Sequence, residues 1–128
     1  MNAPQHFLHR ISIFGLLGTA SFAFGGLPPD CYDPQNDTHA IKQCQWKALE
    51  YYDAQLNRNY HQLKHTLSRK EQSRLRNAQR AWIVWRDKEC AFEGYPMRGG
   101  SAEQHFVNDC LIRLTRQRAV GLRSLAEE

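Results

Sequence analysis

Apolar residues recur every three to five positions in three segments of the chain, which is the spacing of one face of an α-helix. The first segment follows an N-capping cluster, Asn36-Asp37-Thr38, and ends near residue 66. The second runs from about 69 to 92, and the third starts at residue 101. No alternating, strand-like run competes with them, so we expect an all-α fold. The short connections predict a three-helix bundle in which neighbouring helices are antiparallel.

Each predicted helix carries one stripe of positions that should face the core. The stripes are Ile41, Cys44, Ala48, Tyr51, Leu56, Tyr60, Leu63 and Leu67 in the first helix, Leu75, Ala78, Trp82, Trp85 and Glu89 in the second, and Val107, Leu111, Leu114, Arg118, Leu122 and Leu125 in the third.

Two capping boxes mark the starts of the second and third helices. In Ser68-Arg-Lys-Glu71, the serine hydroxyl and the glutamate carboxylate can each satisfy a free backbone N–H at a helix start. Ser101-Ala-Glu-Gln104 has the same pattern. Between the two helices, the stretch Gly94–Gly100 cannot continue either one, so we expect a connecting loop there.

The first residues have the layout of a signal peptide. Arg10 precedes an uncharged run, Ile11–Phe24, which is too short for a membrane span. Small residues permit cleavage after Ala23 or after Gly25, so we assign residues 1–25 to the signal peptide and 26–128 to one domain. No small-residue lipid box precedes Cys31, so the cleaved protein is not expected to be membrane-anchored.

The four cysteines, Cys31, Cys44, Cys90 and Cys110, all lie in the exported part. An even number in a small exported domain predicts two disulfides. No two have the close spacing of a structural zinc site, and no metal is expected. We favour the sequential pairing Cys31–Cys44 and Cys90–Cys110. A hairpin turning near residue 67 leaves Cys44–Cys90 open as an alternative, because both cysteines lie about equally far from that turn.

The net charge excludes few classes of function. Without residues 1–25 the chain has 16 Lys and Arg against 13 Asp and Glu, a net charge of +3. Export, and the mixing of acidic with basic residues along the helices, both argue against a nucleic-acid partner.

The stretch Ala78–Cys90, "AQRAWIVWRDKEC", holds two tryptophans and several charged residues. Trp82 and Trp85 continue the apolar stripe, so we expect both in the core. Arg86 lies on a neighbouring line and should hydrogen-bond to backbone carbonyls or to an acid on another helix, whereas Asp87 should face water. The stretch has neither a nucleophile with a base nor a pair of carboxylates, so we expect neither an enzyme nor a cofactor.

Two other groups could bind something. His61 and His65 stand one turn apart, but no third metal ligand lies near them, which favours exposed histidines. Tyr95, Met97 and Arg98 lie between glycines that permit unusual backbone angles, which makes them the candidate partner-binding residues.

Three motifs together resemble the LprI-type lysozyme-inhibitor domain family. The first is a glutamine, an aspartate and an L-N-x-x-Y run, the second is A-Q-R-A-W-I-x-x-R-D-x-x-C, and the third is G-G-S followed by C-L-x-x-x-T-x-x-R-x-x-x-L. The matching signature positions include Leu56, Asn57, Tyr60, Gln79, Trp82, Arg86, Asp87, Thr115 and Arg118. The resemblance covers residue 31 to about residue 125.

This resemblance implies a periplasmic or secreted helical domain that binds a protein and is not an enzyme. Lysozyme inhibition is attributed to the family's namesake, which is a lipoprotein, whereas this chain lacks the lipid box. The implied partner is lysozyme or another envelope or host protein, approached by loop insertion or surface occlusion. An envelope scaffold or stress protein is the alternative, and the oligomeric state stays open. Animal-type lysozymes are usually basic, so a chain at +3 gains no long-range attraction to them.

Overall fold

The computed structural model describes residue 31 and residues 33–128. It contains three long helices, α1 (Thr38–Thr66), α2 (Arg69–Gly94) and α3 (Ser101–Ala126), and a short 3-10 helix, η2 (Tyr95–Met97). No strand occurs among the described residues, so the all-α prediction is confirmed. The predicted signal peptide, residues 1–25, lies outside the described part of the chain.

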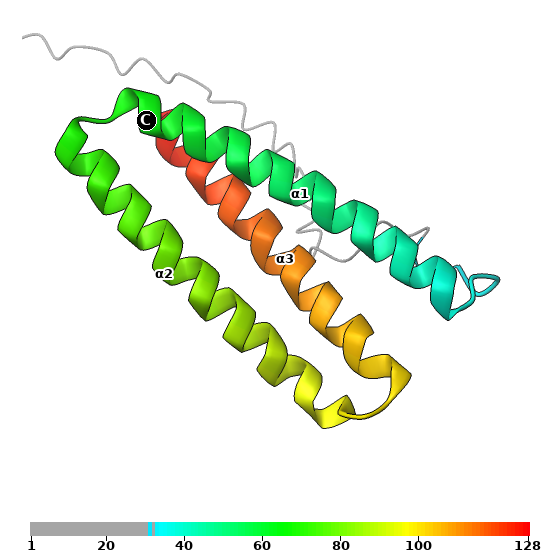
Figure 1. Cartoon of the computed structure of the whole chain (residues 1–128). Coiled ribbons are helices and arrows are strands. Elements are labelled where there is room, and N and C mark those ends of the chain that lie inside the picture. Colours follow the sequence, from blue (N-terminus) through cyan, green and yellow to red (C-terminus); the bar gives the residue numbers. More distant parts are fainter. Residues whose placement is uncertain (1–30, 32) are drawn as a thin grey trace, which may run out of the picture.

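Helix α3 lies at the centre of the arrangement (Figure 1). It runs parallel to α1 and antiparallel to α2, and it packs along α1 over most of its length and, less extensively, along α2. Helices α1 and α2 meet at their connection near residue 67 and diverge from there. We call this the hairpin end, which also holds the C-terminus of α3. The opposite end, with the Tyr95–Gly100 connection and the start of α1, is called the loop end.

Local capping explains where two of the helices begin. Asp37 caps α1 by accepting a hydrogen bond from the Ala40 N–H at 2.8 Å. At α2, the Glu71 carboxylate accepts from the Ser68 N–H at 2.9 Å and the Ser68 hydroxyl accepts from the Glu71 N–H at 3.4 Å, so the first capping box is confirmed.

The second predicted capping box is wrong. Ser101 is already the first residue of α3, and Gly100 occupies the N-cap position without a side-chain cap. The chain reverses through Gly99 at φ 82°, a conformation that favours glycine, and the helix begins one residue earlier than it would with Ser101 as its cap. Glu103 accepts a hydrogen bond from the Gly99 N–H at 3.0 Å and holds the turn in that way.

The capping box at α2 should make the stability of the protein depend on pH. The hydrogen bonds from Ser68 lower the pKa of Glu71 in the folded chain. A lowered folded pKa contributes stability above the ordinary glutamate pKa, and this stability is lost as the pH falls through the lowered value. We therefore expect the stability difference between the wild type and Glu71→Ala to be largest at neutral pH and to shrink in acid. Thermal unfolding of both proteins from neutral pH to about pH 3 measures it, and a constant difference would contradict the prediction.

The buried core consists of three clusters, all of which include residues of α3. The apolar members are Cys31, Ala48 and Ile112 in the first, Leu56, Leu63, Ala119 and Leu122 in the second, and Cys90, Cys110 and Leu114 in the third. From α2 only Cys90 is a buried apolar side chain. The helix is therefore attached to the rest of the molecule by a narrow face.

Several predicted core positions are exposed. Tyr51 is 57% exposed, Trp85 is 48% exposed and Leu125 is 52% exposed. The placement of Trp85 in the core was wrong because α2 packs mainly on one neighbouring helix, so the positions beside its contact line stay in solvent. Conversely, Ile112 was absent from the predicted stripe and is 1% exposed, because the central helix is covered on more than one side.

Both disulfides follow the sequential pairing. Cys31 is joined to Cys44 and Cys90 to Cys110, with Cα atoms 5.4 and 5.3 Å apart, so the favoured prediction is confirmed. The alternative Cys44–Cys90 bond is wrong, because each of these cysteines is bonded to another one and α1 and α2 diverge towards the loop end.

Candidate functional site

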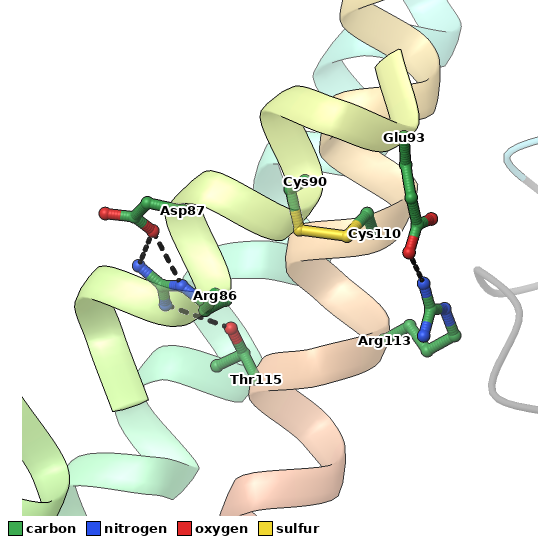
Figure 2. The surroundings of a disulfide bond; sticks show 7 residues. All are labelled: Arg86, Asp87, Cys90, Glu93, Cys110, Arg113 and Thr115. Atoms are coloured by element: carbon green, nitrogen blue, oxygen red, sulfur yellow. Dashed lines mark hydrogen bonds and ion pairs between the residues drawn. A yellow bond between two sulfur atoms is a disulfide. The ribbon is translucent and has the colours of Figure 1, made fainter. Parts of the chain in front are cut away.

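Arg86 links α2 to the central helix. Its guanidinium donates to the Asp87 carboxylate at 2.9 and 2.8 Å and to the Thr115 hydroxyl at 3.2 Å (Figure 2). Thr115 is completely buried, and the Arg86 side chain is only 16% exposed. The expected partners of Arg86 were wrong, since the acid is its own neighbour Asp87 rather than a residue of another helix. Asp87 is exposed, as expected, but it also neutralises this half-buried arginine.

A second polar link lies nearer the hairpin end. Arg118 on α3 donates from Nε to the Gln79 side-chain oxygen at 3.0 Å, and Gln79 is buried. The guanidinium carbons of Arg118 and Arg86 lie 5.8 and 5.2 Å from the centre of the Trp82 ring, within range of cation–π attraction. Burial lowers the pKa of Arg118. The half-buried indole of Trp82 therefore contacts two arginine side chains at the α2–α3 interface.

The remaining signature residues lie on α1. Leu56 is buried in the core, and Tyr60 packs against the same cluster. Asn57 is exposed and donates to the Asp53 carboxylate one turn earlier, at 3.3 Å. The structure thus brings together the signature residues of α2 and α3, while Asn57 lies apart from them. These contacts join the helices to one another.

The candidate partner-binding residues form an exposed and closely supported loop. Tyr95 is 59% exposed and Met97 is 43% exposed, and Arg98 is also exposed. The Arg98 guanidinium carbon lies 5.1 Å from the centre of the Tyr95 ring, so the two side chains present one joint surface.

Backbone and covalent contacts hold this loop in place. The Arg98 N–H donates to the Tyr95 carbonyl at 3.0 Å, and the Gly100 N–H donates to the Met97 carbonyl at 3.1 Å. Below the loop, the Cys90–Cys110 bond and the 2.6 Å ion pair between Arg113 and Glu93 join α2 to α3 (Figure 2). Gly94 packs so tightly that an added Cβ would lie 2.5 Å from a methyl carbon of Val107.

Sequence reasoning missed two aromatic residues that flank the loop. Phe92, near the end of α2, is 74% exposed, and Phe106, near the start of α3, is 46% exposed. Large exposed apolar side chains gathered at one end of a molecule are typical of interaction surfaces. Their positions just before and just after a glycine-rich connection were the available signal.

The fold separates charges that appear mixed along the sequence. Residues 53–81 and 114–128, which form the half nearer the hairpin end, hold ten Lys and Arg against four Asp and Glu, a net charge of +6. Residues 31–52 and 82–113, which form the half nearer the loop end, hold six against eight, a net charge of −2. The candidate loop therefore belongs to an acidic half of a basic protein.

His61 and His65 are both exposed on α1. Within the described part of the chain, no cluster of three or more His, Cys, Asp or Glu side chains could hold a metal ion. None of the helices described there is both long and apolar enough to cross a membrane.

Comparison with known proteins gives the family. Residues 31–122 match the family model described as lysozyme inhibitor LprI. The chain is also 49% identical over 53 residues to an uncharacterized protein of Rhizobium meliloti (strain 1021), a match that covers 41% of this chain and only 38% of the relative's length. No solved structure matches the chain. Since the family match includes all four cysteines and the Trp82–Arg118 region, the chain belongs to the lysozyme inhibitor LprI family.

Proposed function

We propose that this protein is an exported, non-catalytic binding domain that inhibits lysozyme with its Tyr95–Arg98 loop. The observation that carries the proposal is the joint exposure of Tyr95 and Arg98 on a loop held from below by a disulfide. Two disulfides in a small domain are typical of compartments outside the cytoplasm, which supports a periplasmic or secreted location.

The chemistry of the target suits such a loop. Glycoside hydrolysis uses two carboxyl groups that flank the scissile bond in a cleft. A guanidinium can donate two parallel hydrogen bonds to one carboxylate, so Arg98 has the right geometry to engage them. A tyrosine adds a large apolar surface with a polar tip, and tyrosine and arginine often dominate the energetics of interfaces. Because backbone hydrogen bonds already order this loop, binding would cost less conformational entropy.

The separation of charge between the two halves of the molecule removes an electrostatic argument against a basic lysozyme as the partner. A protein with a net charge of +3 would repel a basic lysozyme if its charge were spread evenly. The half of the molecule that carries the loop instead has a net charge of −2, and the excess positive charge lies towards the other end. A basic partner would therefore meet the loop end first, and the field should favour that orientation.

We expect Tyr95→Ala or Arg98→Ala to weaken inhibition at least tenfold, which corresponds to about 1.4 kcal/mol of binding free energy. The measurement is lysis of bacterial cell walls by animal-type lysozyme with purified mature protein whose disulfides are intact. Arg76→Ala is the matched control, because Arg76 is an exposed arginine of α2 in the basic half. Circular dichroism should show unchanged helix content in all three variants.

The possible outcomes distinguish lysozyme inhibition by this loop from the alternative hypotheses. Full lysis at tens of micromolar wild-type protein, on the order of the weakest useful affinity, would reject lysozyme inhibition and leave an envelope scaffold or stress protein. Inhibition that survives both loop substitutions would keep the function and move the site elsewhere. Raising the salt concentration to about 0.3 M should slow association without abolishing inhibition, because screening removes long-range attraction but not local contacts.

A further inference from the structure

Trp46 is the most exposed tryptophan that the structure describes, and it does not belong to the loop. Its side chain is 62% exposed on the first half of α1, and its indole N–H donates to the Glu50 carboxylate at 3.0 Å. This hydrogen bond joins the ring to the carboxylate one turn further along α1. Trp46 belongs to none of the core clusters, so its large aromatic ring contributes no core packing to the fold.

Two adjoining hollows meet at Trp46 and Glu50. The smaller, of about 250 Å³, lies where α1 and α2 diverge and includes Asp53 and Arg86 in its lining. The larger, of about 830 Å³, lies between α1 and the start of α3. Its lining includes the amide side chains of Gln104 and Asn108. The exposed ring thus shares both hollows with polar side chains.

A polar network leads from the buried Gln45 side chain to the exposed Gln104 amide. Gln45 is completely buried and donates to the His105 carbonyl at 3.1 Å and to the Asp109 carboxylate at 2.8 Å. Its oxygen accepts from the Asn108 amide at 3.2 Å. The Asn108 oxygen in turn accepts from Gln104 at 2.8 Å. Such a satisfied network is rigid, so the amides at the rim of the hollow are oriented in advance of any ligand.

The chemistry of this surface selects one class of ligand. The two hollows carry charges of both signs, with Lys42 and Lys47 in the larger and Arg86 in the smaller against the carboxylates of Glu50 and Asp53, so the surface does not favour one sign of ligand charge. A purely apolar ligand would leave the amides and carboxylates without partners, which is costly. A sugar satisfies both requirements, since the C–H face of a pyranose ring packs on an indole while its hydroxyls exchange hydrogen bonds with amides and carboxylates. The two hollows provide room for sugar units beside the ring.

We propose that the Trp46 surface binds a neutral oligosaccharide. Trp46 supplies the stacking face, Glu50 fixes the ring and accepts from a hydroxyl, and Gln104 and Asn108 donate to and accept from the sugar's polar groups. This activity does not depend on lysozyme inhibition, because the loop and the Trp46 surface share no residue.

The test is isothermal titration of the oxidised protein with the tetrasaccharide of chitin and, separately, with cellotetraose. We expect saturable binding of at least one of them, and Trp46→Ala should weaken it at least tenfold. Asn108→Ala should also weaken it. The matched control is Trp85→Ala, which removes an exposed tryptophan from α2 and should leave the affinity unchanged. Circular dichroism of each variant confirms that the fold is intact.

Two results would overturn the proposal. One is the absence of saturable binding of both tetrasaccharides at about 5 mM, well above the millimolar range of weak recognition. The other is equal affinity in the wild type and in a folded Trp46→Ala. Tyr95→Ala should retain sugar binding whether or not it inhibits lysozyme, so failure of one proposal is distinguishable from failure of the other.

Discussion

Replacing Trp82 with alanine is expected to lower the free energy of unfolding by about 3 kcal/mol, at the lower end of the usual cost of removing a core aromatic side chain. The lower end applies because the indole is half-buried rather than fully enclosed. It packs against two of the three core clusters and against two arginine side chains. Helix α2 has few other buried apolar groups, so no neighbour can replace this contact.

Urea unfolding, followed by circular dichroism, measures the loss for Trp82→Ala. Trp85→Ala is the matched control, because Trp85 is 48% exposed and its removal should cost less than about 1 kcal/mol. If the Trp82→Ala protein unfolds at the urea concentration of the wild type, then α2 is not held by this ring. A folded Trp82→Ala protein that has lost partner binding would show that this face is a binding surface instead.

Removal of the Cys90–Cys110 bond is expected to cost about 3 kcal/mol, because the bond closes a loop with a sequence separation of 20 residues in the unfolded chain. The double variant Cys90→Ser, Cys110→Ser tests it. Both positions are essentially inaccessible to solvent, so the serine hydroxyls also need hydrogen-bond partners that the cluster does not supply. The loss of stability should therefore exceed that from loop entropy alone.

This variant also tests how the loop end is held. The divergence of α1 and α2 leaves α3 as the principal support for the end of α2. Without the bond, amide hydrogens near the end of α2 should exchange faster than those near Ser68, where the capping box is intact. The double variant Cys31→Ser, Cys44→Ser is the control, since its bond ties only the lead segment to α1. Uniform exchange rates along α2 would contradict this account.

Much of the local structure could be predicted from the sequence. The helix starts at Thr38 and Arg69 follow from side chains within three residues, because a cap needs only its own turn to satisfy backbone N–H groups. The pairing of the cysteines could also be predicted, since a short connection between the helices brings Cys90 and Cys110 close together. The candidate loop was located by its glycines, and the structure places Tyr95 and Arg98 there on the surface.

The width of each buried face could not be predicted in this way. Helical periodicity indicates the direction of an apolar stripe, but the number of neighbouring helices decides how much of it is covered. Trp85 is exposed because α2 packs mainly on one helix, whereas Ile112 is buried because α3 is covered by two. The helix was assigned correctly from the sequence, but Trp85 was still predicted to lie in the core although it is exposed.

Local sequence determined where α1 and α2 begin and which cysteines could meet, because caps, turns and short loops act within a few residues. Tertiary structure alone decided which charges and side chains from distant segments share a surface. Antiparallel packing brings the C-terminal halves of α1 and α3 beside the N-terminal half of α2, and so gathers positive charge near one end. The parallel packing of α1 and α3 sets Gln45 against Asn108, 63 residues away, and so builds the polar surface beside Trp46.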